Sequence, residues 1–137
     1  MEKIRVTPKM VTIEVSDNGE TIKFCADELL MDGLVEIVSL VNESKKNAPS
    51  MIEDESSLKD SANYLKRIAA DVADKIDELF GPETCRKVFH GNVPTLQAEV
   101  EFFTQITPIV RKFIREENER VSRHTEKYVR SPANKSQ

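Results

Sequence analysis

Residues 57–81 read SLKDSANYLKRIAADVADKIDELFG, and this stretch decides the fold. Its apolar residues recur in alternating steps of four and three, which places them along one side of a helix. Ser57 and Asp60 form a capping-box-like pair at the start, and Gly81 suits a left-handed helix end. We favour packing of this seam within the chain, the alternative being contact with another protein. The apolar seam consists of Leu58, Ala62, Leu65, Ala69, Val72, Ile76 and Leu79.

The N-terminal part predicts a β-hairpin over residues 10–25. Two short runs alternate apolar and polar residues on either side of Asn18-Gly19, the dipeptide that best suits a type I′ turn. A turn at this point pairs Val15 with Ile22 and Ile13 with Phe24, which gives the hairpin one apolar face. A further short strand before Pro8 is suggested by two alternating apolar residues, Ile4 and Val6.

Residues 27–46 predict a helix with a broad apolar surface. Asp27 suits its N-cap position. The width of the surface predicts burial on more than one side. After it, residues 47–56 contain Pro49 and the acids Glu53, Asp54 and Glu55, which indicates an exposed linker. The apolar residues of the helix are Leu29, Leu30, Met31, Leu34, Val35, Ile37, Val38, Leu40 and Val41.

The C-terminal part predicts a short helix over residues 83–89 and a long one over about 94–128. His90-Gly91-Asn92 separates the two, and Asn92 or Thr95 can cap the second. Pro108 lies inside the long helix, where a proline costs about 3 kcal/mol, so we expect a kink or a division. The segment beyond Arg115 should project from the core, and residues 131–137 should be disordered. The apolar stripe of the long helix contains Leu96, Val100, Phe103, Ile106, Val110, Phe113 and Ile114.

Length and composition predict a single domain over residues 1–130, mainly α with a small N-terminal β-hairpin (α+β) and about four helices. The net charge of −4 is uneven, because residues 111–137 hold 8 of the 20 Lys and Arg but only 4 of the 24 Asp and Glu. Cys25 and Cys85 match no disulfide framework, and we interpret them as small buried residues in a reducing compartment. Without a signal segment or a membrane-spanning run, the chain is expected in the cytoplasm, with no membrane partner.

The sequence contains no recognisable catalytic, metal-binding or cofactor-binding motif. His90 and His124 are interpreted as a turn histidine and a solvated helix histidine, and not as a catalytic base or a zinc ligand. GxSxG, GxGxxG and GxxxxGK are absent, and the acids at 53–55 lack the pattern of a calcium loop. We therefore expect no enzyme, no cofactor and no metal, and a chain that works by binding other proteins.

The basic C-terminal segment makes nucleic acid a partner to consider. Its Lys and Arg residues are interspersed with Glu116, Glu117, Glu119 and Glu126, which is typical of a solvated helix face with salt bridges. A nucleic-acid-binding arm would carry Lys and Arg with few acidic residues between them. We do not expect nucleic acid as a partner, and a small nucleic-acid-binding regulator remains the weakest alternative.

The order of parts resembles one group of phage proteins. After the hairpin and the first helix come LFG at 79–81, CRKVF at 85–89, GN-x-P at 91–94, FF at 102–103 and TPIVRKF at 107–113. Over residues 10–120 the chain resembles the small tail-module proteins of long-tailed phages and prophages of Gram-positive bacteria. Several of those proteins are regarded as tail assembly chaperones.

The resemblance implies a non-enzymatic role in virion assembly in the host cytoplasm. Such chaperones coat the aggregation-prone tape measure protein, bring tail tube protein to it and leave before the tail is finished. Those two proteins are the implied partners, and a homo-oligomer is a further option. A structural tail or connector subunit retained in the virion is the alternative. The candidate partner-binding residues lie on the seam and the last helix: Leu58, Leu65, Val72, Ile76, Leu79, Phe103 and Phe113.

Overall fold

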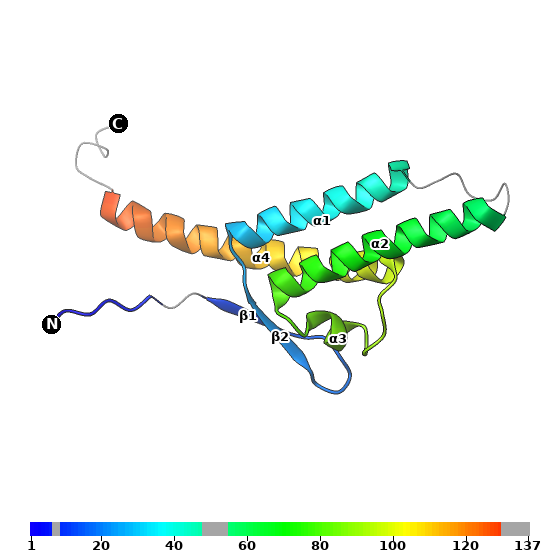
Figure 1. The fold of residues 1–137 in the computed structure, drawn as a ribbon. Coiled ribbons are helices and arrows are strands. Elements are labelled where there is room, and N and C mark those ends of the chain that lie inside the picture. The colour runs from blue at the N-terminus through cyan, green and yellow to red at the C-terminus, as the bar shows by residue number, and fades with distance from the viewer. Residues whose placement is uncertain (7–8, 48–54, 130–137) are drawn as a thin grey trace.

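The computed structural model describes residues 1–6, 9–47 and 55–129, with side chains up to residue 126, and this part of the chain forms a hairpin and four helices (Figure 1). Strands β1 (Met10–Glu14) and β2 (Thr21–Cys25) precede helices α1 (Glu28–Asn47), α2 (Glu55–Phe80), α3 (Thr84–Val88) and α4 (Leu96–Val129). The predicted fold class is confirmed. The linker residues Pro49, Glu53 and Asp54 and the predicted disordered tail at 131–137 lie outside the described residues.

Helix α2 is the central element, because it packs against α1, α3, α4 and β2. The second half of its predicted seam is buried: Ala69 is 6% exposed, and Val72 and Ile76 are 0% exposed. Val72 and Ile76 join one core with the hairpin, α1 and α4. Packing within the chain is therefore confirmed for this half of the seam.

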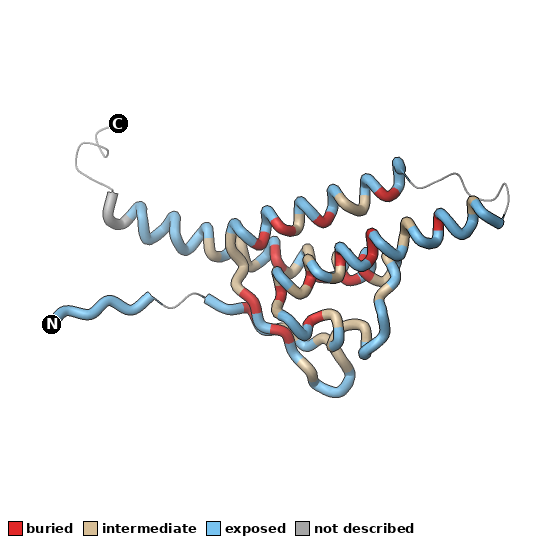
Figure 2. The backbone as a smooth tube through the Cα atoms, viewed as in Figure 1, coloured by how far each residue is buried: buried red, intermediate tan, exposed pale blue. Residues whose placement is uncertain are grey.

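The first half of the seam was predicted wrongly. Leu58 is 51% exposed and Ala62 is also exposed, whereas Ser61 and Ile68 are buried in their place. The first turns of α2 extend past the hairpin and α3 and run beside the end of α1 (Figures 1 and 2). Since fewer elements surround them there, a continuous heptad pattern overstates how much of the helix is covered.

Aromatic rings connect the hairpin to the helices. The Phe24 ring on β2 lies 4.9 Å from that of Phe80 on α2, and Phe80 lies 5.6 Å from Phe102 on α4, both edge to face. Buried residues gather where these three elements meet α1 (Figure 2). The core is therefore concentrated around the second half of α2.

The hairpin forms as predicted, but its register is shifted by two residues. Val11 pairs with Phe24 and Ile13 with Ile22, in place of the expected pairs of Ile13 with Phe24 and Val15 with Ile22. The shift keeps the same apolar face, because side chains alternate with a period of two.

The turn is the cause of the shifted register. A type I′ turn needs positive φ at both Asn18 and Gly19, but only Gly19 has one, at 82°. The Ser16 hydroxyl accepts the Glu20 N–H at 3.2 Å, and the Ser16 carbonyl accepts the Gly19 N–H at 3.1 Å. These bonds close a four-residue loop over residues 16–19, and the prediction of a two-residue turn was wrong.

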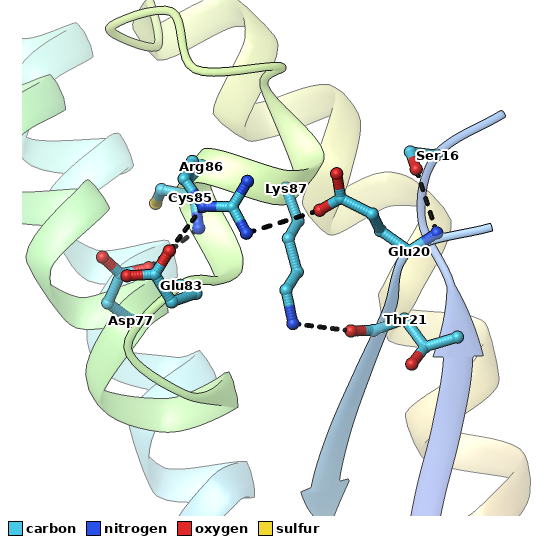
Figure 3. Close-up of polar contacts among 8 residues, drawn as sticks. All are labelled: Ser16, Glu20, Thr21, Asp77, Glu83, Cys85, Arg86 and Lys87. Carbon is cyan, nitrogen blue, oxygen red and sulfur yellow. Dashed lines mark hydrogen bonds and ion pairs between the residues drawn. The ribbon is translucent and has the colours of Figure 1, made fainter. Parts of the chain in front are cut away.

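Polar contacts attach the hairpin to α3 (Figure 3). Lys87 Nζ donates to the Thr21 carbonyl at 2.9 Å, and Arg86 lies 3.5 Å from the Glu20 carboxylate while also pairing with Glu83. Asp77 of α2 accepts the Cys85 N–H at 2.8 Å. Helix α3 therefore holds the β2 edge of the hairpin against α2.

The chain breaks between the helices occur where the sequence predicts them. Gly81 has a φ of 114°, and His90 and Gly91 have φ values of 57° and 79°. The Thr95 hydroxyl accepts the Ala98 N–H at 3.1 Å and caps α4. Helix α4 continues through Pro108, so the proline does not divide it into two helices.

Both ends of the described chain extend from the body (Figures 1 and 2). The second half of α4 projects with exposed side chains from Glu119 to Glu126, as predicted. The expected short strand at Ile4 and Val6 is absent from the described residues, where the two side chains are 89% and 85% exposed. No described helix combines the length and apolar character that a membrane crossing requires.

Candidate functional site

Helix α1 is fixed to α2 along one side. The Asp27 carboxylate accepts the Leu30 N–H at 2.9 Å and caps the helix, as predicted. A Cβ placed on Gly33 would lie 2.9 Å from Leu79 Cγ, so the missing side chain permits the two helices to approach closely. Ile37 is fully buried one turn later, and Lys75 of α2 pairs with Glu36 of α1. This side of α1 belongs to the core.

Away from this core side, α1 carries large apolar side chains that remain exposed in the described chain, three of them on one side of the helix and Leu29 apart from them. Leu29 is 75% exposed, Met31 45%, Val35 66% and Val38 54%. The prediction that α1 is buried on more than one side was therefore wrong. Single exposed apolar residues are ordinary, but a group of this size on one helix is typical of a binding surface.

Three of these four residues line an apolar groove between α1 and α4, which we call the α1–α4 groove. Its volume is about 710 Å³. The groove exists because α1 and α4 each pack more closely on α2 than on one another. Leu29 lies outside it. The apolar lining comprises Met31, Leu34, Val35 and Val38 from α1 and Phe103, Val110 and Ile114 from α4.

The α4 wall of the groove also carries charge. Arg111, Arg115 and Glu119 line it, and all three are exposed. Within the described residues the two arginines form no ion pair, whereas Arg120 is bound to Glu117 through two hydrogen bonds. Those hydrogen bonds lower the pKa of Glu117. Two unpaired guanidinium groups at the edge of an apolar groove favour a partner with carboxylates beside its apolar face.

The groove continues toward the base of the hairpin. A second hollow shares Met31, Ile114 and Asn118 with it and reaches Val11 and Phe113. The exposed apolar surface therefore follows α4 into its projecting half, where Val121 is 50% exposed.

The predicted partner-binding residues fall into three groups. Phe103 lines the α1–α4 groove and Phe113 lines the adjoining hollow. Val72 and Ile76 are fully buried in the core, so the prediction that they contact a partner was wrong for this fold. The remaining three lie on α2 away from the groove: Leu58 is exposed, Leu65 is partly buried, and Leu79 packs against Gly33.

Met31, Val35, Val38 and Ile114 were missed as binding residues. The sequence did show that α1 has more apolar residues than one face needs, but this excess was interpreted as additional burial. Only the placement of α4 beside α1 shows that the surplus faces a groove.

Two buried titratable groups lie away from the groove. Burial raises the pKa of Glu99 to about 8, and neither of its carboxylate oxygens has a hydrogen-bond partner among the described residues. Burial, followed by the nearby Asp77 carboxylate, raises the pKa of Cys85 to about 12. Both shifts favour the protonated form at neutral pH.

The remaining polar residues form no recognisable reactive group. His90 lies in the turn after α3 and is exposed, and His124 lies on the projecting half of α4. Within the described ranges no three His, Cys, Asp or Glu side chains come together as metal ligands.

Comparison with known proteins gives a single assignment. Neither the curated proteins nor the solved structures with which the chain was compared gave a match. Residues 26–137 match a protein family, and this segment begins directly after β2 and includes all four described helices. The match covers most of the chain, which therefore belongs to the family of unknown function DUF6673.

Proposed function

We propose that this chain is a non-enzymatic assembly protein that binds an amphipathic helix of a partner in the α1–α4 groove. The observation that carries the proposal is the row of exposed apolar side chains, Met31, Val35 and Val38, along an open groove. Leaving such a row in water is unfavourable by roughly 25 cal/mol per Å² of apolar surface, and a partner that covers it recovers this free energy.

A helix is the shape that fits the groove best. Helices α1 and α4 both lie on α2, so a helix in the groove would complete a four-helix arrangement around the shared core. Met31, Val35 and Val38 follow the i, i+4, i+7 spacing and span about 10 Å, or two helical turns. A helix-in-groove contact uses this spacing on both sides.

The arginines at the edge of the α1–α4 groove indicate which charge the partner helix carries beside its apolar stripe. Arg111 and Arg115 favour a helix that carries Asp or Glu on the flank that faces α4. The partner that we propose therefore has an apolar stripe with acidic residues along one side of it.

The resemblance to phage tail-module proteins supplies the candidate partners. A tail assembly chaperone must bind long, helical, apolar segments of tape measure protein and release them, which suits an open and partly charged groove. Tail tube protein is the second candidate, and the setting is the host cytoplasm. A structural subunit that stays in the virion remains the alternative.

The proposal of a non-enzymatic role rests on the chemistry of the buried groups. The Cys85 thiol is protonated at neutral pH, and its sulfur lies 3.4 Å from the Ala73 carbonyl inside the fold. In the part of the chain that the structure describes, no His or Cys side chain lines the α1–α4 groove. These features favour binding over catalysis.

The test is co-expression of the chain with phage tape measure and tail tube proteins, followed by affinity capture. We expect tape measure protein to be captured by wild type and by the control Leu29→Asp, which alters an exposed residue of α1 outside the groove. The double variant Val35→Asp with Val38→Asp should lose it. Equal capture by wild type, the control and the double variant would show that tape measure protein does not bind in the α1–α4 groove. Detection of the chain in finished particles would favour the structural subunit.

A further inference from the structure

The outer edge of β1 is an unpaired strand edge. The Val15 N–H donates to the Glu20 carbonyl at 2.9 Å, and bonding alternates along antiparallel strands, so the N–H and C=O groups of Thr12 and Glu14 point away from β2. Within the described residues the sheet has only two strands. The β2 edge is different, because α3 approaches it and Lys87 binds its Thr21 carbonyl.

A second groove, separate from the α1–α4 groove, runs between this part of β1 and α4. We call it the β1–α4 groove; its volume is about 720 Å³. Ile13 and Val15 line one side, and Phe102 and Ile109 of α4 line the other. Val88 and Phe89 at the end of α3 also line the groove. The two grooves share no lining residue and use different faces of α4. A groove between a strand edge and a helix has the form that accepts an extended peptide as an added strand.

The charges around the β1–α4 groove have one sign. Glu14, Asp17 and Glu101 line it, and no Lys, Arg or His among the described residues does. All three carboxylates are exposed, and among the described residues none forms an ion pair. The groove therefore favours an extended segment with basic residues on one side and apolar residues on the other.

The N-terminal arm, residues 1–6, has this composition. Ile4 and Val6 share one side of an extended chain, and Lys3 and Arg5 share the other. The arm extends away from its own hairpin (Figure 1), and its two apolar side chains are 89% and 85% exposed.

We propose that the N-terminal arm of a second copy of this chain adds as a strand along β1 in the β1–α4 groove, so that two copies exchange arms. Added strands place side chains on the same two faces as their neighbour. Ile4 and Val6 then face α4 beside Ile13, and Lys3 and Arg5 lie on the same face as Glu14. Each arm covers the open edge of the other copy, which removes the exposed strand edge from both.

The first test is sedimentation velocity on the full chain without an N-terminal tag, from about 1 µM to about 1 mM. We expect wild type to dimerise with increasing concentration. Ile4→Asp with Val6→Asp should weaken dimerisation at least about tenfold, because it places two charges in an apolar contact. Val93→Asp is the matched control, since Val93 is 92% exposed in the loop before α4 and should leave the dimer unchanged.

Charge exchange identifies the arm and the groove as the two contacting surfaces. Lys3→Glu with Arg5→Glu should weaken self-association, and Thr12→Lys with Glu14→Lys should do the same, because Thr12 and Glu14 share a face of β1. A mixture of the two variants should form heterodimers, because each acidic arm then meets a basic groove and each basic arm an acidic one. Lack of association in the mixture, or a wild-type chain that stays monomeric, would overturn the proposal.

Hydrogen exchange tests whether the arm folds back on its own β1. Protection of residues 3–6 should rise with protein concentration if the arms are exchanged, and concentration-independent protection in a monomer would contradict the proposal. The arm variants should still bind tape measure protein, and Val35→Asp with Val38→Asp should still dimerise. Failure of this inference is thereby distinguishable from failure of the proposed function.

Discussion

Helices α1 and α2 have similar apolar content but opposite surroundings. Helix α2 is enclosed by α1, α3, α4 and β2, and its Val72 and Ile76 side chains are fully buried. Helix α1 uses one side for the core, where Ile37 is fully buried, and leaves Val35 and Val38 more than half exposed. The difference shows that an apolar pattern defines which side of a helix avoids water, whereas the neighbouring elements decide whether that side is covered.

The same change in the two helices should give the largest contrast. Val72→Asp buries an unpaired charge at the centre of the core, so we expect a loss of about 4 kcal/mol or more and a largely unfolded chain. Val35→Asp places the charge in solvent and should change the free energy of unfolding by less than about 0.5 kcal/mol. Urea unfolding followed by circular dichroism measures both. Similar losses in both variants would mean that α1 is enclosed as fully as α2.

A second contrast concerns Glu99, a carboxyl group buried in the core with no hydrogen-bond partner among the described residues. Between pH 4.5 and about 8 the unfolded chain has lost the Glu99 proton while the folded chain keeps it. The contribution of Glu99 to stability is therefore greatest below about pH 4.5 and declines as the pH rises through about 8. Glu99→Gln removes this titration and should raise the free energy of unfolding at pH 8 by on the order of 2 kcal/mol.

The pH dependence separates this effect from simple repacking. At about pH 3, well below both pKa values, glutamate and glutamine are uncharged in both states, so the two proteins should unfold at similar urea concentrations. A gain of equal size at both pH values would assign the effect to packing.

The close packing of α1 against α2 can be disrupted at Gly33. Gly33→Ala improves helix propensity by roughly 1 kcal/mol but forces Leu79 to move, at a cost of about 1–3 kcal/mol. We expect a net loss of about 1 kcal/mol in thermal unfolding. Leu79→Ala provides the control, because the double variant should be more stable than the sum of the two single losses predicts. If the two losses of stability simply add in the double variant, the methyl group that Gly33→Ala introduces does not clash with Leu79.

The smallest stability effects should occur at two exposed apolar residues of α1, one inside the α1–α4 groove and one outside it. Leu29→Asp and Val38→Asp should each change the free energy of unfolding by less than about 0.5 kcal/mol. Only Val38→Asp should reduce binding of tape measure protein, by about tenfold or more, since Val38 lines the α1–α4 groove and Leu29 does not. Isothermal titration calorimetry measures the two affinities. Equal binding by both variants would show that the α1–α4 groove is not where the partner binds.

The local structure was largely predictable from the sequence. The helix boundaries follow from Asp27, Gly81 and Thr95, whose caps and φ values match their residue types. The hairpin register was not predictable from Asn18-Gly19 alone, because a single serine hydroxyl, that of Ser16, stabilises a longer loop. Such a bond competes with the preferred turn of a dipeptide and leaves no mark in the apolar pattern.

The candidate site was much less predictable. Phe103 was selected because it lies on the apolar stripe of the last helix, and it does line the groove. Val72 and Ile76 were selected by the same criterion and are buried, since a periodic pattern cannot distinguish a core face from a binding face. The groove depends on the placement of α1 and α4 over α2, which involves residues far apart in the sequence.

The central claim is that the exposed side of α1 and the facing side of α4 bind a partner helix. The most direct test is methyl NMR of the chain during titration with overlapping peptides from a phage tape measure protein. We expect one or more peptides with an acidic flank to shift the methyl signals of Met31, Val35 and Val38 and to leave that of Val93 unchanged. Binding that leaves the three groove signals unchanged, or no binding by any segment, would contradict the account.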